Sequence, residues 1–387
     1  MRARTTLLQV YVDEQGQTHG QAPQAVQVKA WAKVNLALNI LARRPDGYHD
    51  IETVMHRIGL ADDVEVVKGG DVAVAGMSAI TVKVTGVAGV DVSGVPCDLG
   101  NVAFRAAQAF LECLECPGSG CPVSISIRKR IPVGAGLGGG SADAAAVLMA
   151  MNELWGEPYG WRQLMAIAAS IGADVPFCLM NHDLAGRDAG GSAPVNAAFA
   201  EGVGDRLTPL PGLRGVGLLL VTPGYVVSTP DAYAMWDARI AEDAGSGGPA
   251  TAVRQSDPAR EPDRVRPVTA RTARMLAEAL SLARSRAKCA DAGDDLRRVC
   301  SLMSNDFESL IDERYGLIAQ MKQLMMQAGA MGALMSGSGP TVFGVYGSPA
   351  QATEAAEVLR SLAADCGFDV DRYGFSVIDA CIGDSRS

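Results

Sequence analysis

The sequence predicts a mixed α+β fold built from two domains. Three observations support this prediction. Helical and strand-like segments alternate along the chain, which is typical of mixed architectures. A strand, a glycine-rich loop and a helix follow one another directly over residues 123–154. The chain has 387 residues, 48% of them hydrophobic, which is enough to give each of two domains its own core.

The segment Ile131–Ala146 is the strongest local signal. The residues leading into it, Val123–Ile131, alternate apolar and polar side chains and predict a strand. Five of the seven residues in Gly134–Gly140 are glycine, and Ser141–Leu154 predicts a helix with Ser141 as its N-cap. Glycines let the backbone approach a ligand, and the first helical N–H groups attract an anion. This order of elements therefore predicts a polyphosphate site.

The motif alone leaves the kind of glycine loop open. It is not a Walker A loop, because Gly140-Ser141-Ala142 contains no lysine. Gly134–Gly139 fits the dinucleotide pattern Gly-x-Gly-x-x-Gly, but that pattern also requires an acidic residue about 20 positions later, at a strand end. Here only Glu153 and Glu157 lie near that distance, at the end of the predicted helix. A glycine-rich turn that merely packs against a neighbour is the remaining alternative.

Composition excludes several classes of function. The net charge of −9 argues against a general nucleic-acid binder, so a nucleotide must be bound by a local site. No apolar run reaches the length of about 18 residues that a membrane span requires. The N-terminal apolar stretch is too short for a signal peptide, and Asp13 and Glu14 argue against an organelle transit peptide.

The nine cysteines are scattered from Cys97 to Cys381, which fits a reducing, cytoplasmic location. Cys113, Cys116 and Cys121 are compatible with a fragment of a metal site. No second Cys or His pair follows at zinc spacing, however, so these residues are interpreted as thiols and no protein metal site is predicted.

The remaining pattern predicts the domain organisation. Residues 1–25 form an N-terminal extension, residues 26–210 a first domain and residues 211–387 a second, with a polar insertion at about 241–267 that is rich in Gly, Pro, Arg and Asp. Strands are predicted at 25–41, 51–60, 63–67, within 72–95 and at 216–221, and helices at 101–113, 161–171, 269–287, 296–310 and 317–328. A second glycine turn, with Gly337 and Gly339, leads into a strand ending at Tyr346.

Four spaced motifs together resemble the GHMP small-molecule kinases. They are Ala32-Lys33-Val34-Asn35-Leu36, Pro132…Gly138-Gly139-Gly140-Ser141, Gly172-Ala173-Asp174-Val175-Pro176 and Met335-Ser336-Gly337-Ser338-Gly339-Pro340. The segment Arg43–His49, followed by Glu52-Thr53, resembles the family members whose substrate carries a cytidine. The resemblance runs from about residue 28 to 346. It implies an N-terminal domain like the second domain of ribosomal protein S5 and a ferredoxin-like C-terminal domain.

The resemblance implies ATP-dependent phosphorylation of an alcohol on a small molecule that carries a cytidine diphosphate, with Mg²⁺ accompanying the nucleotide. Asp174 matches the catalytic aspartate that accepts the hydroxyl proton. Lys33 matches the lysine beside it, which keeps Asp174 ionised and stabilises a developing alkoxide. An isolated Asp or Lys is more often part of a surface ion pair, so these roles depend on the motifs occurring together.

The resemblance also assigns binding residues. It places the ATP phosphates on the glycine loop, formed by Pro132, Val133, Gly134, Ala135, Gly136, Leu137, Gly138, Gly139, Gly140, Ser141 and Ala142. Ser141 is in addition a candidate ligand of a phosphate-bound Mg²⁺. Asn101 and Lys129 match positions around the nucleotide. The alternatives are a helix N-cap for Asn101 and a solvated lysine for Lys129.

Five further residues are assigned to the substrate. Tyr48 resembles the aromatic residue that stacks on the base, and His49 the residue that reads the edge of the base. Asn35 supports the substrate beside Lys33. Thr229 and Tyr233 match the segment that closes over the cytidine.

One position departs from the family pattern, because Ala142 replaces the usual second serine of the glycine loop. Three alternatives remain: a GHMP kinase acting on mevalonate, homoserine or a sugar, a ligand-binding relative without catalysis, and a dinucleotide-dependent oxidoreductase. Tyr48-His49 argues against the first, because those substrates have no base to stack. Lys33 and Asp174 argue against the second. We expect a monomer or a weak homodimer.

Overall fold

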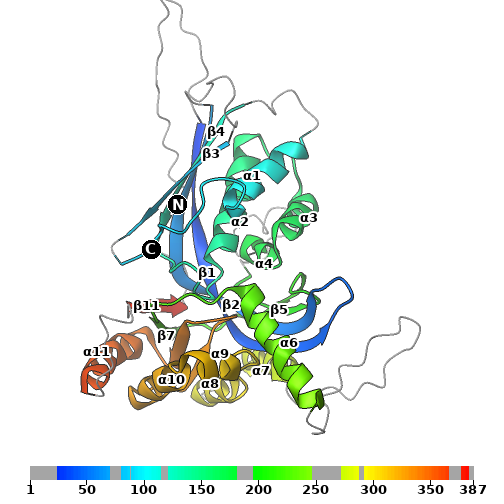
Figure 1. The fold of residues 1–387 in the computed structure, drawn as a ribbon. Helices are drawn as coiled ribbons and strands as arrows, with labels where there is room; N and C mark the ends of the chain where they lie inside the picture. The colour runs from blue at the N-terminus through cyan, green and yellow to red at the C-terminus, as the bar shows by residue number, and fades with distance from the viewer. Residues whose placement is uncertain are drawn as a thin grey trace, which may run out of the picture. The chain divides into compact units, whose positions relative to one another are not determined.

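A computed structural model describes residues 24–69, 80–87, 89–114, 121–180, 195–245, 272–286, 292–365 and 376–382 (Figure 1). The chain forms two compact units. Unit 1 contains residues 1–32, 60–133 and 138–194, and unit 2 contains residues 33–59, 134–137 and 195–387. Two long strands, β1 (Gln24–Arg43) and β2 (His49–Lys68), each contribute one end to each unit. A single cut near residue 210 does not describe this interleaving, so the domain bounds given above stay a prediction.

Unit 1 combines strands with a group of helices. Its elements are β3 (Ile80–Gly86), α1 (Val102–Glu112), β4 (Val123–Lys129), α2 (Gly139–Leu154), α3 (Trp161–Ile171) and α4 (Val175–Met180). Strand β4 pairs antiparallel with the end of β2, where Asp63 lies opposite Arg128, and parallel with β3. The strand predicted at 123–131 and the helix predicted at 161–171 are confirmed.

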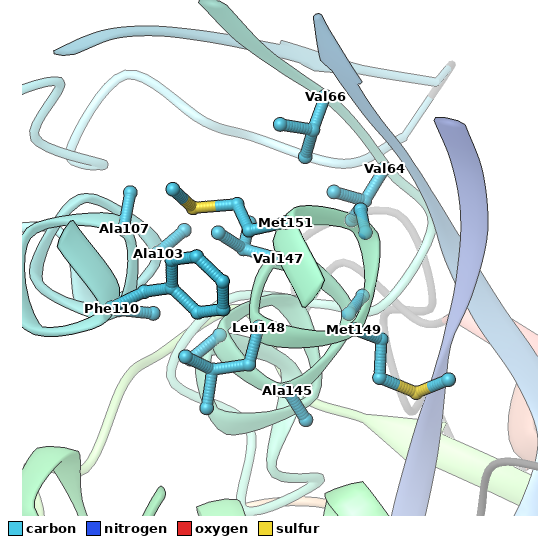
Figure 2. Packing of buried hydrophobic residues seen from close by; sticks show 14 of the residues in the cluster. Val64, Val66, Ala103, Ala107, Phe110, Ala145, Val147, Leu148, Met149 and Met151 are labelled. Atoms are coloured by element: carbon cyan, nitrogen blue, oxygen red, sulfur yellow. The ribbon is translucent and has the colours of Figure 1, made fainter. Parts of the chain in front are cut away.

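The core of unit 1 forms around α2. Apolar residues lie on every face of this helix, so it can be stable in water only if it is surrounded. Every residue from Ala142 to Leu154 except Glu153 is buried. Figure 2 shows Phe110 of α1 beside Leu148 and other α2 residues, within a cluster that also contains valines of β2.

Unit 2 contains the following elements: β5 (Ala197–Glu201), β6 (Arg206–Leu210), β7 (Val216–Thr222), α6 (Thr229–Gly245), α7 (Thr272–Arg286), α8 (Ala292–Ser301), β8 (Ser304–Asn305), α9 (Glu308–Tyr315), α10 (Ile318–Gln327), β9 (Gly332–Met335), β10 (Val342–Tyr346), α11 (Pro349–Asp365) and β11 (Ser376–Ile382). Four of the strands form an antiparallel sheet in the order β11-β7-β10-β9, and α10 and α11 pack on it (Figure 1). Helices separate β7 from β9 and β10 from β11. This strand–helix order is that of a ferredoxin-like domain, as predicted.

Several sequence-based assignments of secondary structure were wrong or incomplete. The strands expected at 51–60 and 63–67 form the single strand β2. The helix expected at 296–310 is interrupted, because β8 pairs with β1 and Asp306 accepts a hydrogen bond from the backbone N–H of Ile40 (2.8 Å). The sequence did not predict helices α4, α6 and α11 or strands β5, β6, β9 and β11.

The two appendages predicted from composition are largely outside the described residues. These are the N-terminal extension, up to residue 23, and the polar insertion beyond the end of α6 at Gly245. Within the ranges that the structure describes, no helix has both the length and the apolar character needed to cross a membrane.

Candidate active site

The first part of the glycine loop, Gly134–Leu137, packs directly on the second glycine turn within unit 2. Gly134 and Gly136 have positive φ angles of 65° and 76°, which favour glycine. A Cβ atom at Gly136 would overlap the carbonyl oxygen of Ser336. The Ser336 hydroxyl instead donates a hydrogen bond to the Gly136 carbonyl oxygen (2.9 Å). Two of the motifs identified in the sequence therefore meet at Gly136 and Ser336.

Helix α2 begins earlier than predicted. Its N-cap is Gly138, at a φ angle of 70°, so the assignment of Ser141 as N-cap was wrong. At Gly139 a Cβ would lie 3.0 Å from Ile131 Cγ2, so a small first residue suits the helix start beside the segment that follows β4. The first intrahelical bond joins Ala142 N–H to the Gly138 carbonyl oxygen (2.9 Å). The N–H groups of the three residues before Ala142 thus have no intrahelical partner and suit an anion.

Lys129 lies between two carboxylates in unit 1. Its side chain is 4% exposed, so the alternative of a solvated lysine was wrong. The ammonium nitrogen is 2.7 Å from Asp143 Oδ2 and 2.5 Å from Asp62 Oδ2. Asp62 Oδ1 also accepts hydrogen bonds from the backbone N–H groups of Arg130 (2.5 Å) and Ile131 (2.8 Å). The three side chains Asp62, Lys129 and Asp143 (the buried triad) therefore connect the end of β4 to the beginning of α2.

The triad holds two carboxylates against one ammonium group. Burial raises the pKa of Asp143 well above its usual range, although the Lys129 charge acts in the opposite direction. Burial by itself lowers the pKa of Lys129, but the two carboxylates outweigh it and raise this pKa overall. Lys129 is therefore held in its charged form.

Asn101 is the N-cap of α1, as its alternative interpretation predicted. Its Oδ1 accepts a hydrogen bond from the Ala103 N–H (2.8 Å), and its Nδ2 donates one to the Pro96 carbonyl oxygen (2.7 Å). Helix capping explains a buried asparagine at this position. The nucleotide-binding roles of Asn101 and Lys129 stay predictions.

Asp174 lies in unit 1 between α3 and α4. Helix α3 ends at Ile171, and α4 starts at Val175, where Pro176 is tolerated because it stands in the first helical turn. The Asp174 carbonyl oxygen accepts the Cys178 N–H (3.1 Å), so the residue stands at the start of the new helix. Its side chain is partly exposed. Asp174 and its expected partner Lys33 belong to different units, so their pairing stays a prediction.

Lys33 and Asn35 form a buried polar network in unit 2, with 4% and 3% of their surfaces exposed. Lys33 Nζ donates to Asn35 Oδ1 (2.6 Å), and Asn35 Nδ2 donates to Thr53 Oγ1 (2.9 Å). Two backbone N–H groups continue the network: that of Lys33 donates to the Leu137 carbonyl oxygen (3.0 Å) and that of Asn35 to Ser336 Oγ (3.3 Å). The network joins β1 and β2 to both glycine motifs.

The turn between β1 and β2 positions Tyr48. The Arg44 N–H donates to the Tyr48 carbonyl oxygen (2.7 Å), and the Tyr48 N–H donates to Asp46 Oδ1 (3.2 Å). Arg44 and Asp46 also form an ion pair at 2.8 Å. These bonds close the turn and leave 66% of the Tyr48 surface exposed. An exposed aromatic ring on a closed turn suits stacking on a planar ligand.

His49 is buried against helix α6. Its ring stacks on Tyr233 with a centroid separation of 4.5 Å and an interplanar angle of 14°. Its Nε2 lies 2.8 Å from Asp237 Oδ1. At the start of α6, Thr229 Oγ1 lies 3.2 Å from the hydroxyl oxygen of Ser338. The structure therefore brings His49, Tyr233 and Asp237 together, and the cytidine-binding roles of His49 and Tyr233 stay predictions. The spacing of Tyr233 and Asp237, four residues apart on one helix, is the sequence signal that could have revealed this neighbour.

Two family models match parts of this chain. The model described as GHMP kinases N terminal domain matches residues 101–182, and the model described as GHMP kinases C terminal matches residues 286–365. Curated relatives are similar over most of the length. A 4-diphosphocytidyl-2-C-methyl-D-erythritol kinase of Geobacter sp. (strain M21) is 36% identical, covering 87% of this chain and 95% of the relative. The relative of the same name from Acetivibrio thermocellus is 32% identical, covering 89% and 98%.

Solved structures are similar as well. A 4-(cytidine 5'-diphospho)-2C-methyl-D-erythritol kinase superposes with a TM-score of 0.58 at 28% identity, covering 92% of this chain and all of that chain. A homoserine kinase from Cytophaga hutchinsonii superposes with a TM-score of 0.58 at 18% identity, covering 92% of this chain and 94% of that chain. The L. major mevalonate kinase superposes with a TM-score of 0.56 at 14% identity, covering 93% of this chain and 97% of that chain. At such low identity, the last two show a common fold alone.

Proposed function

Because this chain belongs to the GHMP kinase family, we propose that it uses ATP to phosphorylate the 2-hydroxyl group of 4-diphosphocytidyl-2-C-methyl-D-erythritol. This reaction is a step of the methylerythritol phosphate route to isoprenoid precursors. The relatives of that name match this chain over nearly their whole length, 95% and 98% of it for two of them. The observation that supports the substrate best is the Tyr48-His49 turn, with His49 stacked on Tyr233.

The glycine loop fits the ATP phosphates. Its positive-φ glycines expose backbone, and the free N–H groups at the start of α2 supply donors without a side chain. Backbone donors also make Ala142 tolerable at the position of the usual second serine. Ser141, the third residue of α2, supplies a hydroxyl oxygen that suits a phosphate-bound Mg²⁺. When bound, ATP with Mg²⁺ provides the phosphoryl group and neutralises part of its charge.

In this proposal Asp174 and Lys33 have separate catalytic roles. Asp174, at the start of α4, accepts the proton of the attacking hydroxyl. Lys33 is assigned the positive charge that stabilises the developing alkoxide. Asn35 orients the Lys33 ammonium group through their 2.6 Å hydrogen bond.

The cytidine end is assigned to unit 2. Tyr48 offers an exposed ring for stacking, and His49 reads the base edge. Thr229 and Tyr233, both on α6, close the site over the nucleoside. A monomer or weak homodimer and a cytoplasmic location stay predictions.

A substrate panel tests the proposed function. Purified protein is incubated with ATP and, in separate reactions, with 4-diphosphocytidyl-2-C-methyl-D-erythritol, mevalonate or homoserine, and ADP release is measured. We expect turnover with the cytidine substrate alone, because the other two alcohols have no base for Tyr48 and His49. Preferential turnover of mevalonate or homoserine would contradict the proposal and favour another member of the family.

A further inference from the structure

One face of helix α6 makes two different contacts with a single histidine. Tyr233 and Asp237 are four residues apart, so both side chains lie on the same side of the helix. The Tyr233 ring packs against the plane of His49, while the Asp237 carboxylate meets its Nε2 edge at 2.8 Å. Phe307 supports Tyr233 from behind in an edge-to-face contact with a centroid separation of 4.9 Å. The His49 ring is therefore fixed both in its plane and in its rotation.

The Asp237 carboxylate contacts two basic side chains, those of His49 and Arg43. It is about one-third exposed, and its second oxygen lies 3.5 Å from Arg43 Nη1. An ionised carboxylate only accepts hydrogen bonds, so the nitrogen that contacts it must carry the proton. His49 Nε2 is therefore the protonated nitrogen.

The protonation of Nε2 determines the chemistry of the other nitrogen. In a neutral imidazole one nitrogen donates and the other accepts, so a neutral ring with its proton on Nε2 has a lone pair on Nδ1. Among the residues that the structure describes, no hydrogen-bond partner for His49 Nδ1 is present. Cytosine presents an amino group at its 4-position, which donates, whereas uracil presents a carbonyl oxygen there, which accepts. An accepting Nδ1 matches the first base and repels the second.

We propose that Asp237 is a positioning residue for base selection: it holds the proton on His49 Nε2, so that Nδ1 accepts a hydrogen bond from the 4-amino group of cytosine and discriminates against uracil. The proposal rests on the proposed function for the presence of a cytidine in the substrate. Asp237 itself does not touch the base in this account.

The state of the ring is tested directly by NMR. Long-range ¹H–¹⁵N spectra of the ¹⁵N-labelled full chain show which imidazole nitrogen carries the proton, and the spectrum of His49→Gln identifies the His49 signals by their loss. At neutral pH we expect a protonated Nε2 and a bare Nδ1 in the wild-type protein. A ring protonated on Nδ1, whether neutral or doubly protonated, would overturn the proposal. This measurement needs neither substrate nor activity.

The consequence for selectivity is tested by kinetics. Asp237→Asn keeps the size of the side chain, but an amide can either accept from or donate to Nε2, so the ring is no longer held in one state. We expect the ratio of kcat/KM for the cytidine substrate to that for its uridine counterpart to fall about tenfold, through KM rather than kcat. Such a split is the signature of a binding contact that is equally strong before and during the reaction.

Glu242→Gln is the matched control, because it removes the same charge from an exposed position on the same helix. It should leave both the ratio and the ring state unchanged. An unchanged ratio in Asp237→Asn, or an equal fall in Glu242→Gln, would overturn the proposal. If the wild-type protein does not phosphorylate the cytidine substrate at all, the proposed function fails, and the NMR measurement still decides the state of His49.

Discussion

His56 is a buried histidine whose two ring nitrogens both form hydrogen bonds within the fold. It is fully buried, its Nδ1 donates to the Arg57 carbonyl oxygen (2.7 Å), and its Nε2 accepts from the Leu213 N–H (2.8 Å). Both ring nitrogens are thus satisfied in the neutral form, and a second proton would have no acceptor. Burial lowers the pKa of His56 from 6.5 to about 4.

This environment predicts a pH dependence of stability. The unfolded chain binds a proton at His56 below about pH 6.5, whereas the folded chain does so only below about pH 4, so the stabilisation is lost as the pH falls through that window. Between pH 7 and pH 5 the free energy of unfolding of the wild-type protein should decrease by about 2 kcal/mol relative to that of His56→Gln, whose side chain does not titrate. Urea unfolding of both proteins at the two pH values measures this difference. Parallel changes in the two proteins would contradict it.

The glycine loop is held by contacts beside its ends and by a contact in its middle. On the entry side, Asp62 binds the backbone where β4 ends, and Lys129 links Asp62 to Asp143 near the start of α2. Within unit 2, the Gly136 carbonyl oxygen accepts a hydrogen bond from Ser336. A loop that must bind phosphates through its backbone gains from such contacts, because its N–H groups are then already oriented.

Two glycine-to-alanine substitutions test whether the contact between the two glycine motifs constrains the loop. Gly136→Ala should lower the melting temperature by several degrees, because the new Cβ overlaps the Ser336 carbonyl oxygen and the residue has a φ angle of 76°. Gly140→Ala should leave the melting temperature unchanged or raise it slightly. Its Cβ would lie 3.6 Å from the nearest atom, Val102 Cγ2, and alanine favours the helical conformation of α2 more than glycine does. Thermal unfolding compares the two. Equal effects would mean that the contact between the two glycine motifs does not constrain the loop.

At the scale of the whole molecule, local patterns predicted the elements better than their connections. Period-two alternation identified β4, and the glycine spacing identified the loop, because both signals lie in adjacent residues. The triad of Asp62, Lys129 and Asp143 depends on the pairing of β2 with β4, which no local pattern specifies. Asp237 was missed for the same reason, since its contact with His49 joins residues 188 positions apart.

The interruption between α8 and α9 has a different cause. The segment 296–310 has a helical pattern, but Ser304 and Asn305 pair with β1, and Asn305 Nδ2 donates to the carbonyl oxygens of Met335 and Gly337 (both 2.8 Å). These tertiary bonds outweigh helix propensity, which is a weak local preference. The interleaved units likewise follow from the length of β1 and β2, whose two ends belong to different units.

The central claim is that Asp174 acts as the base that activates the acceptor hydroxyl, and one variant tests it most directly. In Asp174→Asn, kcat for the cytidine substrate should fall by about 10²–10⁴-fold, because the amide cannot accept the proton, while calorimetric ATP affinity stays nearly unchanged. Glu112→Gln, which alters an exposed carboxylate at the end of α1, should behave like the wild type. Normal turnover by Asp174→Asn would contradict the account.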